Sequence, residues 1–317
     1  MFGRLQKQIG SSPLITIAIP AYKKTYLVEA IQSALSQTYE NIELIIVDDN
    51  SPNDLISIVR QFDDKRIRYY RNEENLGKRN VVKNWNRCLQ YARGEFFVLL
   101  CDDDLLEPDF VSDLLSLAEK YPDCNVFHAR RKVLSEQTGE IFEDNAWPEW
   151  ESLETFYENK LKWIRLHTIT EWMFRTNHIA PLQYIEFPVA WGSDDISIIN
   201  FAKDGGIASS QKTLATFRYN DEHLSKADTR MVEKAKARIL NFYWVGEFFH
   251  NDKFYPEYMP HLGEIMLNFI VRTRFRDQIR IWAMTPRQAW CFTKRVKVLA
   301  NILLRRYKHP GCGALGV

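Results

Sequence analysis

The chain has 317 residues and a formal net charge of +1, and it is long enough to bury a large core around one catalytic domain with an extension. Its five cysteines are dispersed and odd in number, so we expect reduced thiols in a cytosolic protein rather than a disulfide framework. No stretch offers about 18 consecutive apolar residues, and the first residues lack the apolar core of a signal peptide. Neither a membrane span nor a secretory leader is therefore expected.

The first part of the chain alternates short apolar runs with segments of helical periodicity. Apolar, β-branched runs predict strands at residues 15–20, 42–47, 67–70 and 95–100. Between these runs, the periodicity predicts three helices near residues 27–35, 55–62 and 78–92. Strands that alternate with helices of this length pair in parallel through right-handed crossovers, which predicts an α/β fold.

Acidic side chains follow two of these predicted strands. Asp48 and Asp49 end the second strand, and three consecutive residues, Asp102, Asp103 and Asp104, follow the fourth. Because the carboxyl ends of parallel strands share one sheet edge, where open α/β sheets bind ligands, we expect these carboxylates in one crevice. Crowded carboxylates repel one another and are costly to desolvate, and a bound Mg²⁺ or Mn²⁺ relieves both costs.

The triplet alone has a second interpretation. It could be a solvated loop in which Asp104 or Asp109 caps a helix that starts near Pro108. We favour the ligand site over this alternative, because two predicted strands carry acidic residues at the same edge of the sheet.

A set of short motifs in a fixed order carries a family resemblance. The motifs are Pro20-Ala21-Tyr22, Gln37-Thr38-Tyr39, Val47-Asp48-Asp49-Asn50-Ser51, Asn75-Leu76-Gly77, and Asp102-Asp103-Asp104 with Pro108. In this order and spacing they resemble the family 2 glycosyltransferases, over about residues 13–225 and most strongly over 13–125. The resemblance implies a GT-A fold, which is a Rossmann-like, mostly parallel sheet flanked by helices that binds a nucleotide-sugar.

The resemblance also assigns the nucleotide-sugar site. Asp49 matches the residue that holds the uracil edge, and Asp102 matches the residue near the ribose. The segment that packs against the nucleobase matches Pro20, Ala21 and Tyr22.

A basic residue that many relatives carry in the third helix has no clear counterpart here, because the loop after Gly77 is longer. Lys78, Arg79 or Lys83 could take its place beside the nucleotide. The alternative is that all three face solvent on an ordinary helix.

The implied metal site centres on Asp103, which matches the metal-binding carboxylate of the family's DXD motif. Cys101 stands where the commonest version has its first Asp, which leaves open whether Asp104 also contacts the metal. His223 lies in a segment that resembles the family's closing Tyr-Arg-x-His-x-x-Ser stretch. Its imidazole could approach the metal or the diphosphate, or it could be an ordinary loop histidine. Bound Mg²⁺ or Mn²⁺ would neutralise the charge that builds up on the nucleoside diphosphate leaving group.

A second acidic pair, Asp194 and Asp195, precedes an apolar helical segment and looks like the family's Glu-Asp motif. The resemblance implies that Asp195 is the general base that takes the proton from the acceptor hydroxyl, with Asp194 in the place of the Glu. Taken alone, the pair could instead cap the start of a helix. The upstream motifs favour catalysis.

The carboxyl-terminal part of the chain differs in composition from the rest. Apolar stripes predict two helices between about 228 and 270, and residues 270–309 carry eleven Lys or Arg against Asp277 alone. Basic residues interleaved with aromatic and aliphatic ones are typical of amphipathic helices on an anionic membrane, which we favour over a packed helical pair and over nucleic-acid binding. We therefore expect a catalytic domain at 13–225, divided into a nucleotide-sugar-binding half (13–125) and an acceptor half (126–225), and a basic helical extension at 226–317.

These features predict a cytoplasmic enzyme, peripheral on the inner face of the cell membrane, that transfers a sugar with inversion by single displacement. The expected donor is a UDP-sugar, and the expected acceptor is a saccharide or lipid-linked saccharide in surface polysaccharide assembly; nucleic acid is not an expected partner. A nucleotidyltransferase also places paired Asp around Mg²⁺, but its Gly-rich, basic loop after the first strand is missing. A non-catalytic nucleotide-sugar-binding protein is the other alternative, and the presence of Asp194 and Asp195 argues against it.

Overall fold

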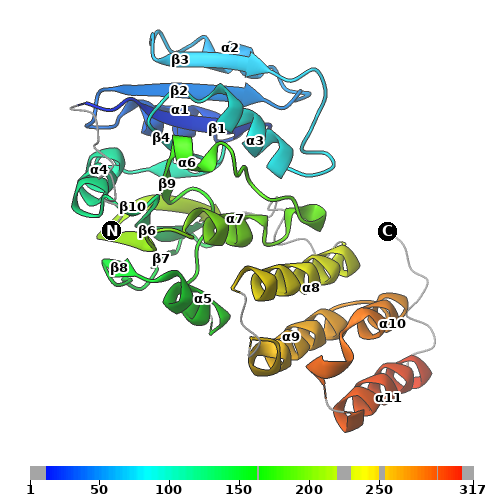
Figure 1. The fold of residues 1–317 in the computed structure, drawn as a ribbon. Helices are drawn as coiled ribbons and strands as arrows, with labels where there is room; N and C mark the ends of the chain where they lie inside the picture. The colour runs from blue at the N-terminus through cyan, green and yellow to red at the C-terminus, as the bar shows by residue number, and fades with distance from the viewer. Residues whose placement is uncertain (1–11, 163, 220–229, 250–253, 291, 309–317) are drawn as a thin grey trace, which may run out of the picture. The chain divides into compact units, whose positions relative to one another are not determined.

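The computed structural model describes residues 12–162, 164–219, 230–249, 254–290 and 292–308 (Figure 1). The chain divides into two compact units. The first comprises Met1–Glu186 and Ser193–Asp221, and the second comprises Phe187–Gly192 and Glu222–Val317. The first unit is a mixed α/β structure with a central sheet, and the second is helical.

One sheet of ten described strands forms the centre of the first unit, in the order β3-β2-β1-β4-β9-β6-β10-β5, with β7 beside β6 and β8 beside β10. The strands are β1 (Ile15–Ala21), β2 (Ile42–Asp48), β3 (Ile67–Arg71), β4 (Phe96–Leu99), β5 (Leu105–Leu106), β6 (Val126–Ser135), β7 (Ile141–Glu143), β8 (Trp150–Glu151), β9 (Trp172–Arg175) and β10 (Ile207–Tyr219).

The pairing changes from parallel to mixed along this sheet. Strands β3, β2, β1 and β4 are all parallel, which confirms the pairing predicted from the strand–helix alternation. Strand β9 is antiparallel to both β4 and β6, while β6 and β10 are parallel. The chain enters β9 from the sheet edge at which β4 ends, so β9 has to run in the opposite direction.

Helices cover the parallel part of the sheet on both faces (Figure 1). Alternate residues of β1, such as Ile15, Ile17 and Ile19, share a core with apolar residues of α1 and α4. Helix α3 packs on β1 and β2. Because both faces are covered, all seven residues of β2 are buried, and residues 44–47 form a continuous apolar run. The helices of this unit are α1 (Leu27–Leu35), α2 (Leu55–Val59), α3 (Val82–Tyr91), α4 (Phe110–Lys120), α5 (Leu153–Leu161), α6 (Thr176–Ile179) and α7 (Ser193–Phe201).

Helix α3 begins at Val82, later than the predicted start near residue 78. Side-chain hydrogen bonds hold the preceding residues in turns instead. Asn75 Oδ1 accepts the backbone N–H of Lys78 at 2.6 Å, and Asn80 Oδ1 accepts that of Val82 at 3.1 Å. Asn side chains that bond nearby backbone N–H groups compete with helix formation in this way.

The second unit is a set of helices that includes the predicted pair between 228 and 270. Helix α9 packs on α8, α10 and η2, and α10 also packs on α11. Gly263 of α9 lets η2 approach closely, because a Cβ there would lie 2.3 Å from the carbonyl oxygen of Ala289. The elements are η1 (Pro188–Ala190), α8 (Met231–Phe248), α9 (Phe254–Val271), α10 (Phe275–Met284), η2 (Arg287–Ala289) and α11 (Phe292–Lys308). Within the described ranges, none of the helices combines the length and the apolar character that crossing a membrane requires.

The basic residues of the second unit differ in their surroundings. The Arg295 guanidinium lies over the Trp282 ring, 4.7 Å from its centroid, and donates to the carbonyl oxygens of Trp282 and Thr285 at 3.2 and 2.8 Å. Arg295 therefore holds α10 and α11 together. In contrast, Arg274, Arg276, Arg287 and Lys297 are exposed.

Candidate active site

The three acidic residues after β4 are buried at the carboxyl edge of the parallel strands. Asp102, Asp103 and Asp104 are 8, 5 and 1 % exposed, so the solvated-loop interpretation is wrong. Asp104 does not cap a helix; α4 begins after Asp109, whose side chain makes no capping hydrogen bond.

Asp102 joins the end of β4 to the end of β1. Its Oδ2 accepts the backbone N–H groups of Tyr22 and Lys23, each at 2.8 Å. Burial raises the pKa of Asp102 to about 6, although the two N–H donors act in the opposite direction. The Pro20-Ala21-Tyr22 motif and the Asp triplet are therefore joined where β1 and β4 end.

Asp103 is the member of the triplet whose side chain has an ammonium group beside it. Lys23 Nζ lies 3.3 Å from Asp103 Oδ2, and the Lys23 side chain is 30 % exposed. Because the Lys23 side chain is partly exposed, its ammonium can move away and leave the Asp103 oxygens to a divalent ion, which prefers oxygen ligands. Asp103 thus fits the metal role that the resemblance implies. Lys23 follows directly on the Pro20-Ala21-Tyr22 motif, but no motif marks it.

Asp104 is tied to the protein by both carboxylate oxygens. Oδ2 accepts the Thr170 hydroxyl at 2.6 Å, and Oδ1 accepts the backbone N–H of Arg218 at 3.0 Å. Burial, followed by the neighbouring Asp103 carboxylate, raises the pKa of Asp104 to about 7. Its contacts identify Asp104 as a structural link between β4, β10 and the loop before β9, and its contact with a metal stays a prediction.

Arg218 organises the same edge from β10. Its Nε donates to the backbone carbonyl oxygen of Asp103 at 3.0 Å, and its other nitrogens pair with Glu136 and Glu29. The guanidinium also lies over the Tyr26 ring. The sequence marks Arg218 only through its place in the family's closing motif, and His223 of that motif lies outside the described residues.

Asp48 and Asp49 have different surroundings at the end of β2. Asp48 is fully buried and accepts from Tyr69, Arg71 and Ser51, so it holds β3 and the following turn in place. Asp49 accepts the backbone N–H groups of Leu76 and Gly77 at 2.9 and 2.7 Å and the Asn72 amide at 2.8 Å.

The Asn75-Leu76-Gly77 motif follows from the position of Asp49. A Cβ at Gly77 would lie 2.8 Å from Asp49 Oδ2, so a larger residue would have to displace this carboxylate or the loop. The loop from 75 to 77 is thus fastened to the carboxylate that the resemblance assigns to the uracil edge.

The other predicted nucleotide-site residues are distributed around this edge. Ala21 is buried and Pro20 partly buried, whereas the Tyr22 side chain is 40 % exposed at the end of β1. Lys78 and Arg79 lie exposed in the turns before α3, and Lys83 is exposed on α3. Contact of any of these side chains with a nucleotide stays a prediction.

The second acidic pair lies in the first turn of α7, where the positive end of the helix dipole favours carboxylates. Asp195 is buried, and Lys160 Nζ at the end of α5 lies 2.7 Å from its Oδ1. The His167 Nε2 atom lies 3.4 Å from the same oxygen. Nothing in the sequence indicates Lys160 or His167, because both are distant from Asp195 along the chain.

One loop connects the two groups of carboxylates. This loop leads into β9 and carries both His167, beside Asp195, and Thr170, which bonds Asp104. Burial lowers the pKa of His167 to about 3, and the Lys160 ammonium acts in the same direction. The imidazole is therefore neutral at physiological pH.

His167, Asp194 and Asp195 also meet a distance requirement for a metal site, since one ligand atom from each lies within 4.8 Å of the others. The Lys160 ammonium lies 2.7 Å from Asp195 Oδ1, closer than the Lys23 ammonium lies to Asp103 Oδ2 at 3.3 Å. Asp103 stays the predicted metal ligand, and this cluster is the alternative.

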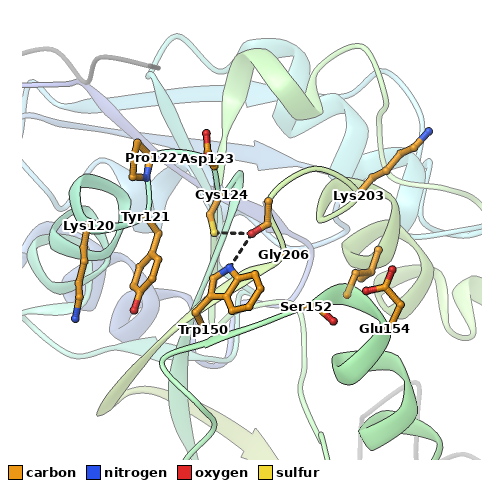
Figure 2. A pocket seen from close by; sticks show the side chains of 12 residues that line it. Lys120, Tyr121, Pro122, Asp123, Cys124, Trp150, Ser152, Glu154, Lys203 and Gly206 are labelled. Atoms are coloured by element: carbon orange, nitrogen blue, oxygen red, sulfur yellow. Dashed lines mark hydrogen bonds between the residues drawn. The ribbon is translucent and has the colours of Figure 1, made fainter. Parts of the chain in front are cut away.

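A pocket of about 510 Å³ lies at the opposite edge of the sheet, where β6 and β10 begin (Figure 2). Trp150 Nε1 and Cys124 Sγ both donate to the carbonyl oxygen of Gly205 there, at 2.8 and 3.0 Å. Its lining contains none of the predicted site residues. We therefore place the candidate active site at the acidic edge.

Proteins of similar sequence include named glycosyltransferases. An uncharacterized glycosyltransferase of Rickettsia typhi is 37% identical over 115 residues, which cover 36% of this chain and 35% of that protein. The GalNAc(5)-diNAcBac-PP-undecaprenol beta-1,3-glucosyltransferase of Campylobacter jejuni is 36% identical over 111 residues, which cover 34% of this chain and 35% of that protein. The match thus spans about a third of the length of these relatives.

Solved structures with the same fold cover nearly the whole chain. TarS 1–349 of S. aureus, in complex with UDP-GlcNAc, gives a TM-score of 0.63 at 16% identity over 96% of this chain and 94% of the TarS chain. The mannosyltransferase PcManGT from Pyrobaculum calidifontis, in complex with GDP-Man and Mn²⁺, gives a TM-score of 0.54 at 16% identity over 94% and 81% of the two chains.

The sheet topology and the similarity to TarS show a GT-A fold, as predicted. The family model of Glycosyl transferase family 2 matches residues 16–177, about half of the chain. The chain belongs to this family.

Proposed function

We propose that the protein transfers a sugar from a UDP-sugar to a saccharide or lipid-linked saccharide, with inversion at the anomeric carbon by single displacement. The observation that carries this proposal is the loop before β9, which bonds Asp104 of the triplet through Thr170 and brings His167 to Asp195. One loop therefore links Asp104, the neighbour of the carboxylate suited to a metal, to the surroundings of the carboxylate suited to a base.

The leaving group would be held at the ends of β1 and β4. Asp103 would bind Mg²⁺ or Mn²⁺, and a divalent ion there neutralises the charge that develops on the diphosphate. Lys23 can contribute further positive charge, because its partly exposed ammonium already lies at Asp103. Tyr22, exposed beside it, would pack against the nucleobase.

The acceptor would be activated by Asp195. This carboxylate takes the proton of the attacking hydroxyl as the new glycosidic bond forms and the bond to UDP breaks. Lys160 keeps the resting carboxylate ionised and oriented, because an opposite charge at 2.7 Å favours the charged form.

The donor and acceptor classes rest on similarity. TarS was solved with UDP-GlcNAc, and the Campylobacter relative is named for an undecaprenol-linked acceptor. PcManGT was solved with GDP-Man and Mn²⁺, so GDP-sugars belong in any test.

A panel of UDP- and GDP-sugars tests the proposal directly. With Mg²⁺ or Mn²⁺ present, we expect one UDP-sugar to be hydrolysed slowly and to raise the unfolding temperature. At 100 times its dissociation constant the ligand should stabilise the fold by about 2.7 kcal/mol. Pyrophosphate release from a nucleoside triphosphate would instead indicate a nucleotidyltransferase, and tight binding without turnover would indicate a non-catalytic binding protein.

We further propose that the second unit binds an anionic membrane surface on the cytoplasmic side, near a lipid-linked acceptor. The exposed residues Arg274, Arg276, Arg287 and Lys297 provide positive charge for this contact. Each basic residue near such a surface contributes about 1 kcal/mol, within a Debye length of about 8 Å at physiological salt.

Charge reversal tests the membrane proposal without disturbing the packing. Replacing these four residues with Glu should abolish co-sedimentation with anionic vesicles, and high salt should do the same to the unmodified protein. Arg295 is left intact because it holds two helices together. Four exposed basic residues of the first unit, Arg60, Lys65, Arg93 and Lys162, provide a matched control. Absence of vesicle binding by the unmodified protein would contradict the proposal and favour a purely structural extension.

A further inference from the structure

The tautomer of His167 follows from its surroundings. The Nδ1 atom lies 3.3 Å from the carbonyl oxygen of Thr168, which can only accept a hydrogen bond. Nδ1 therefore carries the proton of the neutral ring, and Nε2 carries a lone pair. The same carbonyl accepts the Trp172 indole N–H at 2.7 Å, so the loop holds the ring in a defined orientation.

The lone pair of His167 points to the base without a hydrogen-bond partner. Its Nε2 lies 3.4 Å from Asp195 Oδ1, the His167 side chain is completely buried, and Nε2 makes no hydrogen bond within the described part of the chain. When Asp195 is ionised, two hydrogen-bond acceptors, His167 Nε2 and Asp195 Oδ1, face each other with no proton between them. This arrangement is unfavourable in a buried site.

We propose that His167 is a positioning residue for Asp195: once Asp195 has taken the proton of the acceptor hydroxyl, the resulting carboxylic acid donates a hydrogen bond to His167 Nε2. The proposal rests on the proposed role of Asp195 as general base. His167 does not touch the substrate; it stabilises the form of the base that exists only after proton transfer.

The protons and electrons of this step balance. The acceptor O–H bond breaks as its oxygen attacks the anomeric carbon, the proton moves to the Asp195 carboxylate, and the electron pair of the broken glycosidic bond leaves with UDP. The Asp195 carboxylic acid holds that proton against Nε2 and releases it to solvent after the products leave. Lys160 and His167 act in opposite directions, since the ammonium favours the ionised carboxylate and the imidazole favours the protonated one.

The surroundings keep the imidazole a neutral acceptor. The rings of Trp147, Phe156 and Trp172 lie around it, with centroids 6.5, 5.8 and 5.1 Å away. The charged and titratable groups that act on it are Lys160 of α5, Arg131 and His128 of β6, and Asp194 and Asp195 of α7. Burial is the largest of these influences and lowers the pKa of His167.

Nitrogen NMR of the ¹⁵N-histidine-labelled full chain tests the inference without any activity. We expect His167 to show a protonated Nδ1 and an unprotonated Nε2. In Asp195→Asn the new amide can donate a hydrogen bond to Nε2, as the carboxylic acid would. The ¹⁵N chemical shift of Nε2 should therefore change toward that of an imidazole nitrogen that accepts a hydrogen bond. In Asp195→Ala, which has no donor, it should not. A protonated Nε2 in the unmodified protein, or equal spectra for the two variants, would overturn the proposal.

Kinetics of two His167 variants provide the second readout. His167→Phe keeps the aromatic packing but removes the acceptor, so kcat should fall about tenfold, the value of one neutral hydrogen bond, while the KM for the donor is unchanged. His167→Gln keeps an acceptor oxygen and should recover part of the rate. Equal kcat values for His167→Phe and the unmodified protein would contradict the proposal.

The two tests separate this inference from the proposed function. If no sugar is transferred, the proposed function fails while the NMR result still decides the hydrogen bond. If transfer occurs but both His167 readouts are negative, only the inference fails.

Discussion

Replacing Asp195 with Asn is expected to lower turnover by about 10²-fold or more, which is the usual contribution of a general base. The amide keeps the shape of the carboxylate but cannot take the proton of the acceptor hydroxyl. Donor affinity should change little, because Asp195 lies in the first turn of α7 and its Oδ1 faces Lys160 and His167. Steady-state kcat and separate UDP-binding measurements check both parts.

Asp194→Asn is the matched control, since it removes the neighbouring carboxylate from the same helical turn. We expect a smaller loss of turnover. A full loss in Asp194→Asn together with normal turnover in Asp195→Asn would move the base one residue earlier.

Asp103→Ala is expected to remove the dependence of UDP binding on divalent cations and to lower turnover by about 10²–10³-fold, the range for losing one group that stabilises developing charge. The fold should remain intact. The Lys23 ammonium lies beside this carboxylate, and the Lys23 side chain is 30 % exposed, so it can turn to water. Calorimetric titration with UDP, with and without Mn²⁺, together with the unfolding temperature, measures both effects.

Asp109→Ala provides a control a short distance along the chain, because Asp109 is exposed at the start of α4 and forms no helix cap. It should leave metal-dependent UDP binding unchanged. Persistence of that metal dependence in Asp103→Ala would show that the ion binds elsewhere, and the cluster of His167, Asp194 and Asp195 would then be the next candidate.

Asp104 illustrates a limit of motif reasoning. In the sequence, its carboxylate is indistinguishable from that of Asp103. In the structure, Thr170 and the backbone of Arg218 bond its two oxygens, so most of its interactions hold strands together. Segments more than 60 residues away along the chain supply these partners. The sequence around Asp104 therefore does not predict them.

The basic extension shows the same limit for charge counting. Composition treats Arg295 and Lys297 alike, but one is packed over Trp282 and the other is exposed. Long basic side chains can bury their stems and bond carbonyl oxygens, so the number of charges does not give the number available to a surface.

Local signals in the sequence were sufficient to predict the parallel half of the sheet and the acidic positions at its edge. Apolar runs, helical periodicity and Asp residues at strand ends are local signals, and right-handed parallel crossovers leave few arrangements for them. The surroundings of each carboxylate became visible in the folded chain: Lys23 at Asp103, Arg218 at the triplet, and Lys160 with a neutral His167 at Asp195. The physical reason is that burial and charge act through space over a few ångströms, between groups whose distance along the chain is unrelated to their separation in the fold.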